Sequence, residues 1–396
     1  MTPLLPGATL GVLGGGQLGR MWSHAAQALG YRTAVLDPDP HSPAGLISHV
    51  HVCADYLDTT GLAQMAAQCN AITTEFENVP AEALRQLGLT LPCAPSAEPV
   101  SVAQDRAREK AHFVNCGVPV APHAVLHSLD EVQQVNAQLL PGILKTTRLG
   151  YDGKGQIRVA ALAELAAAWQ QLQTSATPTG CILEKRLPLA AECSVVLARG
   201  FDGQMVHLPL QVNVHREGIL AMTEVFEHAL PPKTEQQAFK AAYEVAQGLN
   251  YVGVLCVEFF VLKDGTDRDA LGPLVVNEIA PRPHNSGHHS IDSCDVSQFE
   301  LQVRCMAGLP LVAPRLHSPC VMLNLLGDLW FANGAQASEP DWLQVLALPG
   351  VHLHLYGKSE ARRGRKMGHL TITAAQAEQA RGVALQAAVI LGIASW

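Results

Sequence analysis

The first hundred residues alternate between short apolar runs and longer segments with apolar residues at helical spacing. The runs "TLGVL" (9–13), "RTAVLD" (32–37) and "AITTEFE" (71–77) are typical of buried strands, and helical patterns lie between them at 17–29 and about 61–69. This β-α-β-α-β series predicts an α/β fold that starts with a parallel sheet covered by helices on both faces. Ligands of such sheets bind beyond the carboxyl ends of the strands, so we expect functional residues in the loops there.

The loop after the first strand is rich in glycine. "LGGGQLGR" contains Gly14, Gly16 and Gly19 in the G-x-G-x-x-G spacing of a dinucleotide-binding loop. Asp37 ends the second strand about 20 residues later, where a dinucleotide-binding domain carries its ribose-binding acid. The pattern predicts an anion at the N-terminus of the following helix, but any phosphate would fit there as well as the pyrophosphate of NAD.

Proline-rich stretches divide the rest of the chain. "PCAPSAEP" (92–99) and the prolines at 310–314 mark candidate boundaries, which give segments of about 1–98, 99–312 and 313–396. A chain of 396 residues is long enough for two or three domains with their own cores. With 48% hydrophobic and 16% charged residues, we expect a compact globular protein.

Charge and cysteine content narrow the class of protein further. The formal net charge of −8 gives no general attraction for nucleic acid, and no apolar run approaches the ~20 residues that span a bilayer. No basic residue precedes Arg20, which makes the N-terminus a poor signal peptide. The ten cysteines form no C-x-x-C pair, so we expect free thiols in the cytoplasm and neither a nucleic-acid nor a membrane partner.

A second glycine-rich loop lies within "ILKTTRLGYDGKGQ" (143–156). Lys145 ends its strand, and Lys154 stands among glycines that let a backbone approach phosphate oxygens closely. The spacing is not that of a Walker loop. Two interpretations stay open from the residues alone, a phosphate-binding loop and a solvent-exposed hairpin.

Two glutamates interrupt apolar strands in the middle segment. Glu258 lies inside "VGVLCVEFFVL" and Glu278 follows "LVV", and a carboxylate in such a strand is costly unless a cation meets it. On successive strands the two carboxylates are predicted to share Mg²⁺, although pairing of each with an arginine is the alternative. Arg282 and His284 follow directly; for "HNSGHH" (284–289) we favour catalytic or hydrogen-bonding histidines over a zinc site, because no cysteine accompanies them.

Taken together, several motifs resemble the ATP-grasp superfamily: "KTTRLGYDGKGQ", "EKRLPLAAE", "VEFF", "NEIAPRPHNSGH" and "GRKMGHL". Within it, "GYDGKGQ" and "APRPHNSGH" are similar to the family that carboxylates 5-aminoimidazole ribonucleotide in purine biosynthesis. The resemblance runs from Leu10 to about Leu370. It implies a Rossmann-like preATP-grasp domain (1–98), an ATP-grasp domain (99–312) with a mobile lid at about 112–182, and a small β-rich C-terminal domain (313–396).

The same resemblance implies an activity and its cosubstrates. Bicarbonate would attack the γ-phosphate of ATP to give carboxyphosphate, and the carbon dioxide released would form a carbamate on the exocyclic amine of the ribonucleotide. ADP and phosphate would be the other products, Mg²⁺ the metal, and a homodimer the assembly.

Site residues follow from the resemblance position by position. Mg²⁺ would be bound by Glu258 and Glu278, and bicarbonate and carboxyphosphate would be handled by Arg282 and His284. The positions implied for ATP are Arg106, Lys145, the lid loop Gly150, Tyr151, Asp152, Gly153, Lys154, Gly155 and Gln156, then Glu184, Lys185, Arg186, Leu187, Glu192, His215, Asn277 and Glu278. The positions implied or inferred for the ribonucleotide are Gly16, Gln17, Leu18, Glu75 or Glu77, Tyr151, and the basic residues Arg363, Arg365 and Lys366.

Other functions remain to be distinguished. An NAD(P)-dependent oxidoreductase built on the first loop leaves Glu258 and Glu278 without a role, and a nucleotide-sensing module would not need Arg282 and His284 beside them. Another carboxylate–amine ligase or a formate-dependent transformylase would share the ATP-grasp fold, and "PRPHNSGH" favours the carboxylase over both.

Overall fold

A computed structural model describes residues 2–148, 155–173, 180–332, 334 and 336–394, and within these ranges the strands form three sheets. The N-terminal sheet has the order β3-β2-β1-β4, with every pairing parallel. This confirms the parallel sheet predicted from the alternating pattern. The elements of this part are β1 (Thr9–Leu13), α1 (Gln17–Ala28), β2 (Arg32–Leu36), β3 (Val50–Val52), α2 (Thr59–Gln68), β4 (Ala71–Thr74), α3 (Ala81–Leu87) and α4 (Ala97–Ala103).

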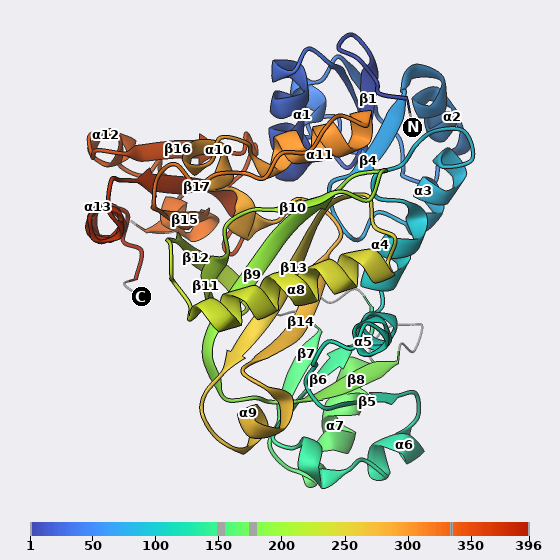
Figure 1. Ribbon diagram of the computed structural model, residues 1–396, viewed down its shortest axis with the longest axis vertical. Helices are drawn as coiled ribbons and strands as arrows, with labels where there is room; N and C mark the ends of the chain where they lie inside the picture. Colours follow the sequence, from blue (N-terminus) through green and yellow to red (C-terminus); the bar gives the residue numbers. More distant parts are fainter. Residues whose placement is uncertain (1, 149–154, 174–179, 333, 335, 395–396) are drawn as a thin grey trace.

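The largest sheet runs through the middle of the molecule (Figure 1), in the order β14-β13-β9-β11-β12-β15-β17-β16, with β10 paired to β9. Thr223 of β12 pairs with Met322 of β15, so this sheet continues from the expected ATP-grasp segment into the C-terminal one. Its strands are β9 (Leu189–Arg199), β10 (Met205–His207), β11 (Gln211–Arg216), β12 (Ile219–Val225), β13 (Gly253–Leu262), β14 (Leu274–Ala280), β15 (Cys320–Leu326), β16 (Val351–Leu355) and β17 (Lys366–Thr373).

Helices cover this sheet and join it to the N-terminal part. Ala242 and Val245 on one face of α8 are buried against Val195 and Leu255 of the sheet, which gives this helix its apolar stripe. Helix α11 packs on α1, where Phe299 shares a core with Trp22. The helices outside the first and third sheets are α5 (Arg106–Asn115), α8 (Pro232–Gly248), α9 (Thr266–Leu271), α10 (Ser290–Ser293), α11 (Gln298–Ala307), α12 (Trp342–Leu346) and α13 (Ala377–Leu391).

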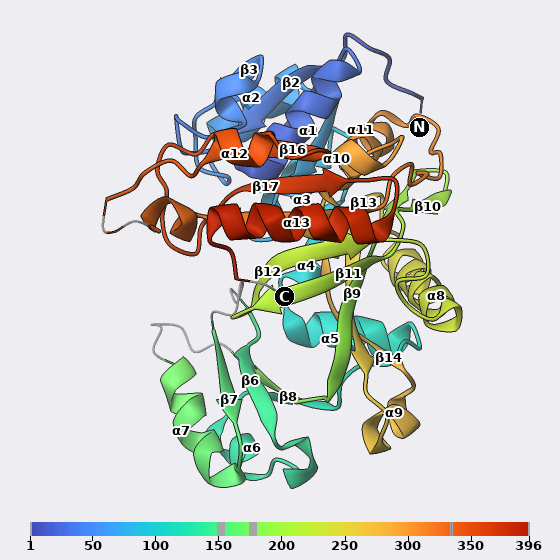
Figure 2. The ribbon, with the colours of Figure 1, turned by 90° about the vertical axis from the view of Figure 1, so that its left-hand side faces the viewer.

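The third sheet lies at the opposite end of the molecule from the N-terminal sheet (Figure 2). It is antiparallel, in the order β5-β8-β6-β7, with α6 and α7 packed on it around Leu144, Trp169 and Leu183. Its elements are β5 (His123–Leu126), α6 (Leu129–Gln133), β6 (Gly142–Thr146), β7 (Gln156–Val159), α7 (Leu162–Leu172) and β8 (Cys181–Lys185). Strand β8 leads into β9, so the residues just after it lie where the small and large sheets meet.

Two expectations from composition are tested by the fold. In the part of the chain that the structure describes, no helix combines the length and the apolar character needed to cross a membrane. All ten cysteines are free thiols, as predicted, and Cys53 is the exposed one among them.

Candidate active site

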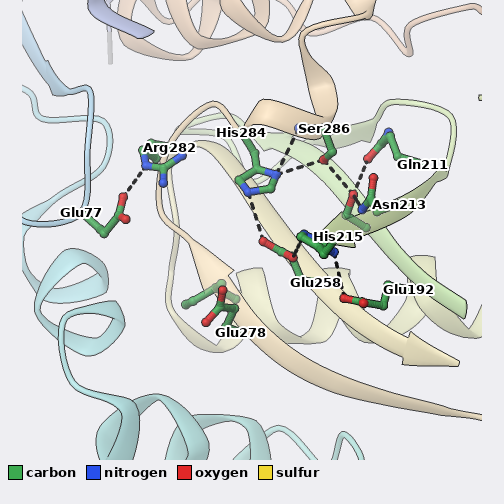
Figure 3. Close-up of polar contacts among 12 residues, drawn as sticks. Glu77, Glu192, Gln211, Asn213, His215, Glu258, Glu278, Arg282, His284 and Ser286 are labelled. Atoms are coloured by element: carbon green, nitrogen blue, oxygen red, sulfur yellow. Dashed lines mark hydrogen bonds and ion pairs between the residues drawn. The ribbon is translucent and has the colours of Figure 1, made fainter. Parts of the chain in front are cut away.

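An irregularity between strands β13 and β14 brings the two strand glutamates together. Val257 pairs with Ile279 and Phe259 with Val276, so Glu258 on one strand faces Asn277 and Glu278 on the other. A bulge of this kind re-aims side chains that regular alternation would separate. Figure 3 shows the carboxylates of Glu258 and Glu278 close together, on the side of the sheet where Arg282 and His284 lie.

Each of these carboxylates has a positively charged or donating neighbour. Arg106 Nη1 lies 2.9 Å from Glu278 Oε2, and His284 Nε2 lies 3.0 Å from Glu258 Oε1. Burial alone would raise the pKa of Glu258, but His284 and His215 lower it to about 2. The alternative of arginine pairing therefore holds for Glu278, whereas Glu258 is paired with histidine.

A buried cluster of opposite charges joins the small sheet to α5. Glu184 at the end of β8 lies 3.1 Å from Lys145 Nζ and 3.2 Å from Lys110 Nζ. Burial would raise the pKa of Glu184, and the two lysines instead lower it to about 2. Lys110 also donates to the backbone oxygen of Asn277 at 2.6 Å. Sequence reasoning missed Lys110, because nothing in its polar helix distinguishes it from neighbouring charged residues.

The other positions assigned to ATP lie around this junction. His215 Nδ1 is 2.9 Å from Glu192 Oε2, and Lys185 forms an ion pair with Asp267 of α9. The side chain of Leu187 is buried, whereas Arg186 is exposed. Gly155 and Gln156 lie at the start of β7; the rest of the assigned lid loop (150–154, which includes Tyr151) lies outside the described residues.

The first glycine loop holds carboxylates of the protein itself. Glu75 accepts hydrogen bonds from the backbone amides of Gly16 (2.6 Å) and Gly19 (2.8 Å), and Asp37 accepts from Gly15 (2.7 Å). Gly14 has a φ of 102°, and a Cβ there would come 2.4 Å from the Glu75 side chain, so only glycine fits.

These contacts answer the question that the glycine pattern raised. The anion at the N-terminus of α1 is Glu75, and burial raises the pKa of this carboxyl while the Gly19 and Gly16 amides partly offset that rise. Asp37 also accepts from the hydroxyl of Tyr56 at 2.9 Å. The amides of Gly15, Gly16 and Gly19 thus already donate to carboxylates of the protein itself. The assignment of Gly16, Gln17 and Leu18 to the ribonucleotide stays a prediction.

Arg282 forms a partly buried ion pair with Glu77. Its Nε lies 2.5 Å from Glu77 Oε2, and Figure 3 shows this pair next to His284. Burial would raise the pKa of Glu77, but the Arg282 guanidinium lowers it to about 2. The pair connects the end of the N-terminal sheet with the loop after β14, and it brings two of the predicted site residues together.

The C-terminal segment contributes a cation that the sequence interpretation did not include. Lys358, in the loop after β16, lies near enough to Glu75 to favour its ionised form, and it donates to the backbone oxygen of Lys366 at 2.7 Å. The neighbouring Tyr356 is buried in the same core as Trp22 of α1, which fixes this loop against the N-terminal part. Nothing in the sequence around Lys358 distinguishes it from other lysines of a polar loop.

The predicted basic residues follow in that loop. Arg363 lies 3.7 Å from Asp328 and over the ring of Phe331, and Arg365 donates to the backbone oxygen of Glu360 at 2.9 Å. Lys366 begins β17.

The histidines considered for zinc point to different partners. His288 Nδ1 lies 2.9 Å from Gln298 Nε2, and His289 Nδ1 lies 2.8 Å from the hydroxyl of Ser293. Elsewhere, His354 and His369 approach Asp292, but their rings stack at 4.6 Å with an interplanar angle of 12°. The in-plane lone pairs of stacked rings run side by side and do not converge on one ion, so this group acts as a contact between α10 and the C-terminal strands.

Comparison with protein families agrees with this architecture. Residues 7–104 match the ribonucleotide synthetase preATP-grasp domain, residues 111–299 the ATP-grasp domain, and residues 320–382 the phosphoribosylaminoimidazole carboxylase C-terminal domain. These matches together cover most of the chain.

Proteins that are similar to this chain along nearly all of its length are named as synthases or synthetases of one kind. The chain is 42% identical over 371 residues to the N5-carboxyaminoimidazole ribonucleotide synthase of Brucella melitensis, across 93% of this chain and 97% of the relative. It is also similar to the crystal structure of the Staphylococcus aureus N5-carboxyaminoimidazole synthetase with ADP (TM-score 0.86, 35% identity, 98% of each chain). The Aspergillus clavatus synthase, solved with ADP and 5-aminoimidazole ribonucleotide, has a TM-score of 0.85 at 29% identity, covering 98% of this chain and all of the other.

Proposed function

The chain belongs to the N5-carboxyaminoimidazole ribonucleotide synthase family of ATP-grasp ligases, and we propose how the residues of its site divide the reaction of that family. The reaction is the ATP-dependent carboxylation of 5-aminoimidazole ribonucleotide in purine biosynthesis. The observation that supports our assignment most strongly is the strand irregularity that brings Glu258 and Glu278 together beside Arg282 and His284.

We assign the binding of ATP to the junction between the small and large sheets. Lys145 and Arg106 are the cations for its phosphates, and each is held by a carboxylate, Glu184 or Glu278. Glu192, whose carboxylate lies 2.9 Å from Nδ1 of His215, is assigned to the ribose hydroxyls. An ATP phosphate would share Lys145 and Arg106 with these internal carboxylates, which hold the cations in place before ATP binds.

The two glutamates fit Mg²⁺, which prefers oxygen ligands and few protein carboxylates. The second oxygen of Glu258 lies 3.9 Å from Nε2 of His215, beyond hydrogen-bond distance, and the Glu278 side chain is 38% exposed. Bound there, Mg²⁺ would neutralise charge that develops on the transferred phosphoryl group.

The carboxylation half of the reaction is assigned to Arg282 and His284. Bicarbonate oxygen attacks the γ-phosphorus of ATP, ADP leaves, and the resulting carboxyphosphate breaks down to carbon dioxide and phosphate. The exocyclic amine then attacks carbon dioxide and loses a proton to give the carbamate. Arg282 supplies a fixed positive charge for the anionic intermediates. The imidazole of His284, beside Glu258, supplies a hydrogen-bonding group for the same intermediates.

For the ribonucleotide we propose the surface between the N-terminal and C-terminal segments. Glu75 and Glu77 supply carboxylates there, and Lys358 with Arg363, Arg365 and Lys366 supplies cations for its 5′-phosphate.

A coupled assay of ADP release tests the proposal. We expect ADP release to require both bicarbonate and 5-aminoimidazole ribonucleotide, and formate in place of bicarbonate to give none. ADP release that ignores both compounds would refute the assignment while leaving the ATP site intact. Rapid release with formate would favour the transformylase alternative.

Assembly and location are also part of the proposal. We expect a homodimer, to be checked by light scattering after size-exclusion chromatography. The ten free thiols support a reducing compartment, the cytoplasm, where disulfides do not persist.

A further inference from the structure

A row of buried polar side chains crosses the large sheet and ends at His284. Thr223 on β12, Asn213 on β11 and Ser194 on β9 are almost completely buried, and the short helical turn after His284 adds Ser286. Figure 3 shows Asn213, Ser286 and His284 in one continuous line of hydrogen bonds towards Glu258. We call these four residues, Thr223, Asn213, Ser194 and Ser286, the polar row.

The geometry of the polar row fixes the direction of its hydrogen bonds. The backbone amide of Ser286 donates to Nδ1 of His284 at 3.4 Å, so this nitrogen carries a lone pair. The Ser286 hydroxyl therefore also donates to it, at 3.0 Å. With its own proton used, Ser286 Oγ accepts from the hydroxyl of Ser194 at 2.8 Å. The Nε2 of His284 then carries the proton and donates to Glu258.

At the far end of the polar row, the hydrogen bonds are also donated towards His284. Asn213 Nδ2 donates to Ser194 Oγ at 2.9 Å, and the Thr223 hydroxyl donates to Asn213 Oδ1 at 2.9 Å, which sets the orientation of the amide. Gln211 Oε1, at 3.2 Å, is a more distant alternative acceptor for Ser194. From Thr223 to Glu258, each donor is thus matched to the next acceptor.

The backbone of His284 is held independently of this row. Gln298 accepts from the His284 amide and donates to its carbonyl, both at 2.8 Å. The hydroxyl at the end of the polar row therefore contacts the imidazole ring, whereas Gln298 holds the backbone.

We propose that Ser194, Asn213 and Thr223 are positioning residues for the carboxylation reaction, which hold the His284 ring with Nε2–H towards Glu258. This inference rests on the proposed function, because it concerns how His284 acts in that reaction. None of the three touches the reacting atoms in our assignment; they act through Ser286. Loss of a link lets the ring turn, and a catalytic group has to be held within about 10–20° of its productive orientation.

Steady-state kinetics of the full chain test the proposal with matched variants. We expect Ser194→Ala and Thr223→Val to lower kcat for carboxylation by about five- to tenfold, with the KM for ATP within about twofold of the wild type. Thr223→Ser keeps the hydroxyl and should restore kcat. The control is Ser293→Ala, which removes an equally buried hydroxyl bonded to Nδ1 of another histidine, His289, and should leave kcat unchanged.

The outcomes separate this inference from the proposed function. If His284→Ala is inactive but Ser194→Ala and Thr223→Val keep the wild-type kcat, the polar row has no positioning role and the assignment of His284 stands. If Ser293→Ala loses as much activity as Ser194→Ala, the effect is general destabilisation and the inference is wrong. If His284→Ala keeps full turnover, both the assignment and the inference are wrong.

Discussion

Glu184 carries a buried negative charge between two lysines, and replacing it with glutamine removes the charge while keeping the size of the side chain. Lys110, which is almost completely buried, would then lose its carboxylate partner, as would Lys145. Removing one partner of a buried ion pair is strongly destabilising because it leaves an uncompensated charge away from water. We therefore expect Glu184→Gln to weaken the folded state substantially.

The size of the effect follows from the titration of Glu184. Its pKa is lowered from an ordinary value of 4.5 to about 2, which corresponds to about 3 kcal/mol of stability at neutral pH. A loss of ~3–5 kcal/mol is typical when a buried pair is broken, so two lines of reasoning agree.

The pH dependence has a definite sign. Because the folded pKa lies below the unfolded value, the stabilisation is fully present above about pH 4.5 and is lost as the pH falls towards 2. The difference between wild type and Glu184→Gln should therefore be largest at pH 7 and should shrink below pH 4.5.

Urea unfolding followed by tryptophan fluorescence measures this difference. One of the five tryptophans, Trp169, lies in the core of the small sheet with Leu183, which precedes Glu184 in the chain, so part of the signal reports on this region. The matched control is Glu224→Gln, which breaks the partly exposed pair with Arg381 and should cost less than about 1 kcal/mol. If Glu184→Gln loses no more than this control at pH 7, or loses the same amount at pH 3, the reasoning is wrong.

Three further predictions concern ligand binding. Glu278→Gln should abolish Mg²⁺-dependent ADP release while circular dichroism shows an unchanged fold; near-normal turnover would contradict the metal assignment. Glu77→Gln removes the charged partner of Arg282 and should lower kcat/KM for the ribonucleotide by about tenfold or more in the ADP-release assay, with the KM for ATP little changed. Lys358→Met should raise the KM for the ribonucleotide by a similar factor; an unchanged KM would place the 5′-phosphate elsewhere.

Local pattern was sufficient for some of the fold. Strands β1, β2 and β4 of the N-terminal sheet are apolar runs, and the helices between them have regular spacing, so the parallel sheet could be predicted. The edge strand β3, with the sequence VHV, was missed because it is short and contains a histidine. The same pattern could not show that β12 pairs with β15, because that contact joins segments about 100 residues apart.

The residues of the site also divide into those that local sequence could predict and those that only tertiary contacts reveal. Glu258 and Glu278 stood out because charge inside an apolar strand is costly, and the structure brings them together across a bulge. Lys110 and Lys358 belong to polar segments where a lysine is ordinary, and only tertiary contacts give them a role. Likewise, serine and threonine in a strand give no sign that they form a row of hydrogen bonds across neighbouring strands.

The contacts of the site share one electrostatic arrangement. Lys145 is held by Glu184, Arg106 by Glu278, Arg282 by Glu77, and the amides of the first glycine loop by Glu75. A buried cation without such a partner would be costly, so the folded chain supplies carboxylates in the positions that anionic ligands are proposed to approach. The anionic ligands proposed for these sites would therefore meet cations that are already held in place by carboxylates. A site arranged in this way is positioned before its ligands arrive, which is the condition for electrostatic stabilisation of phosphoryl transfer without a large cost of reorganisation.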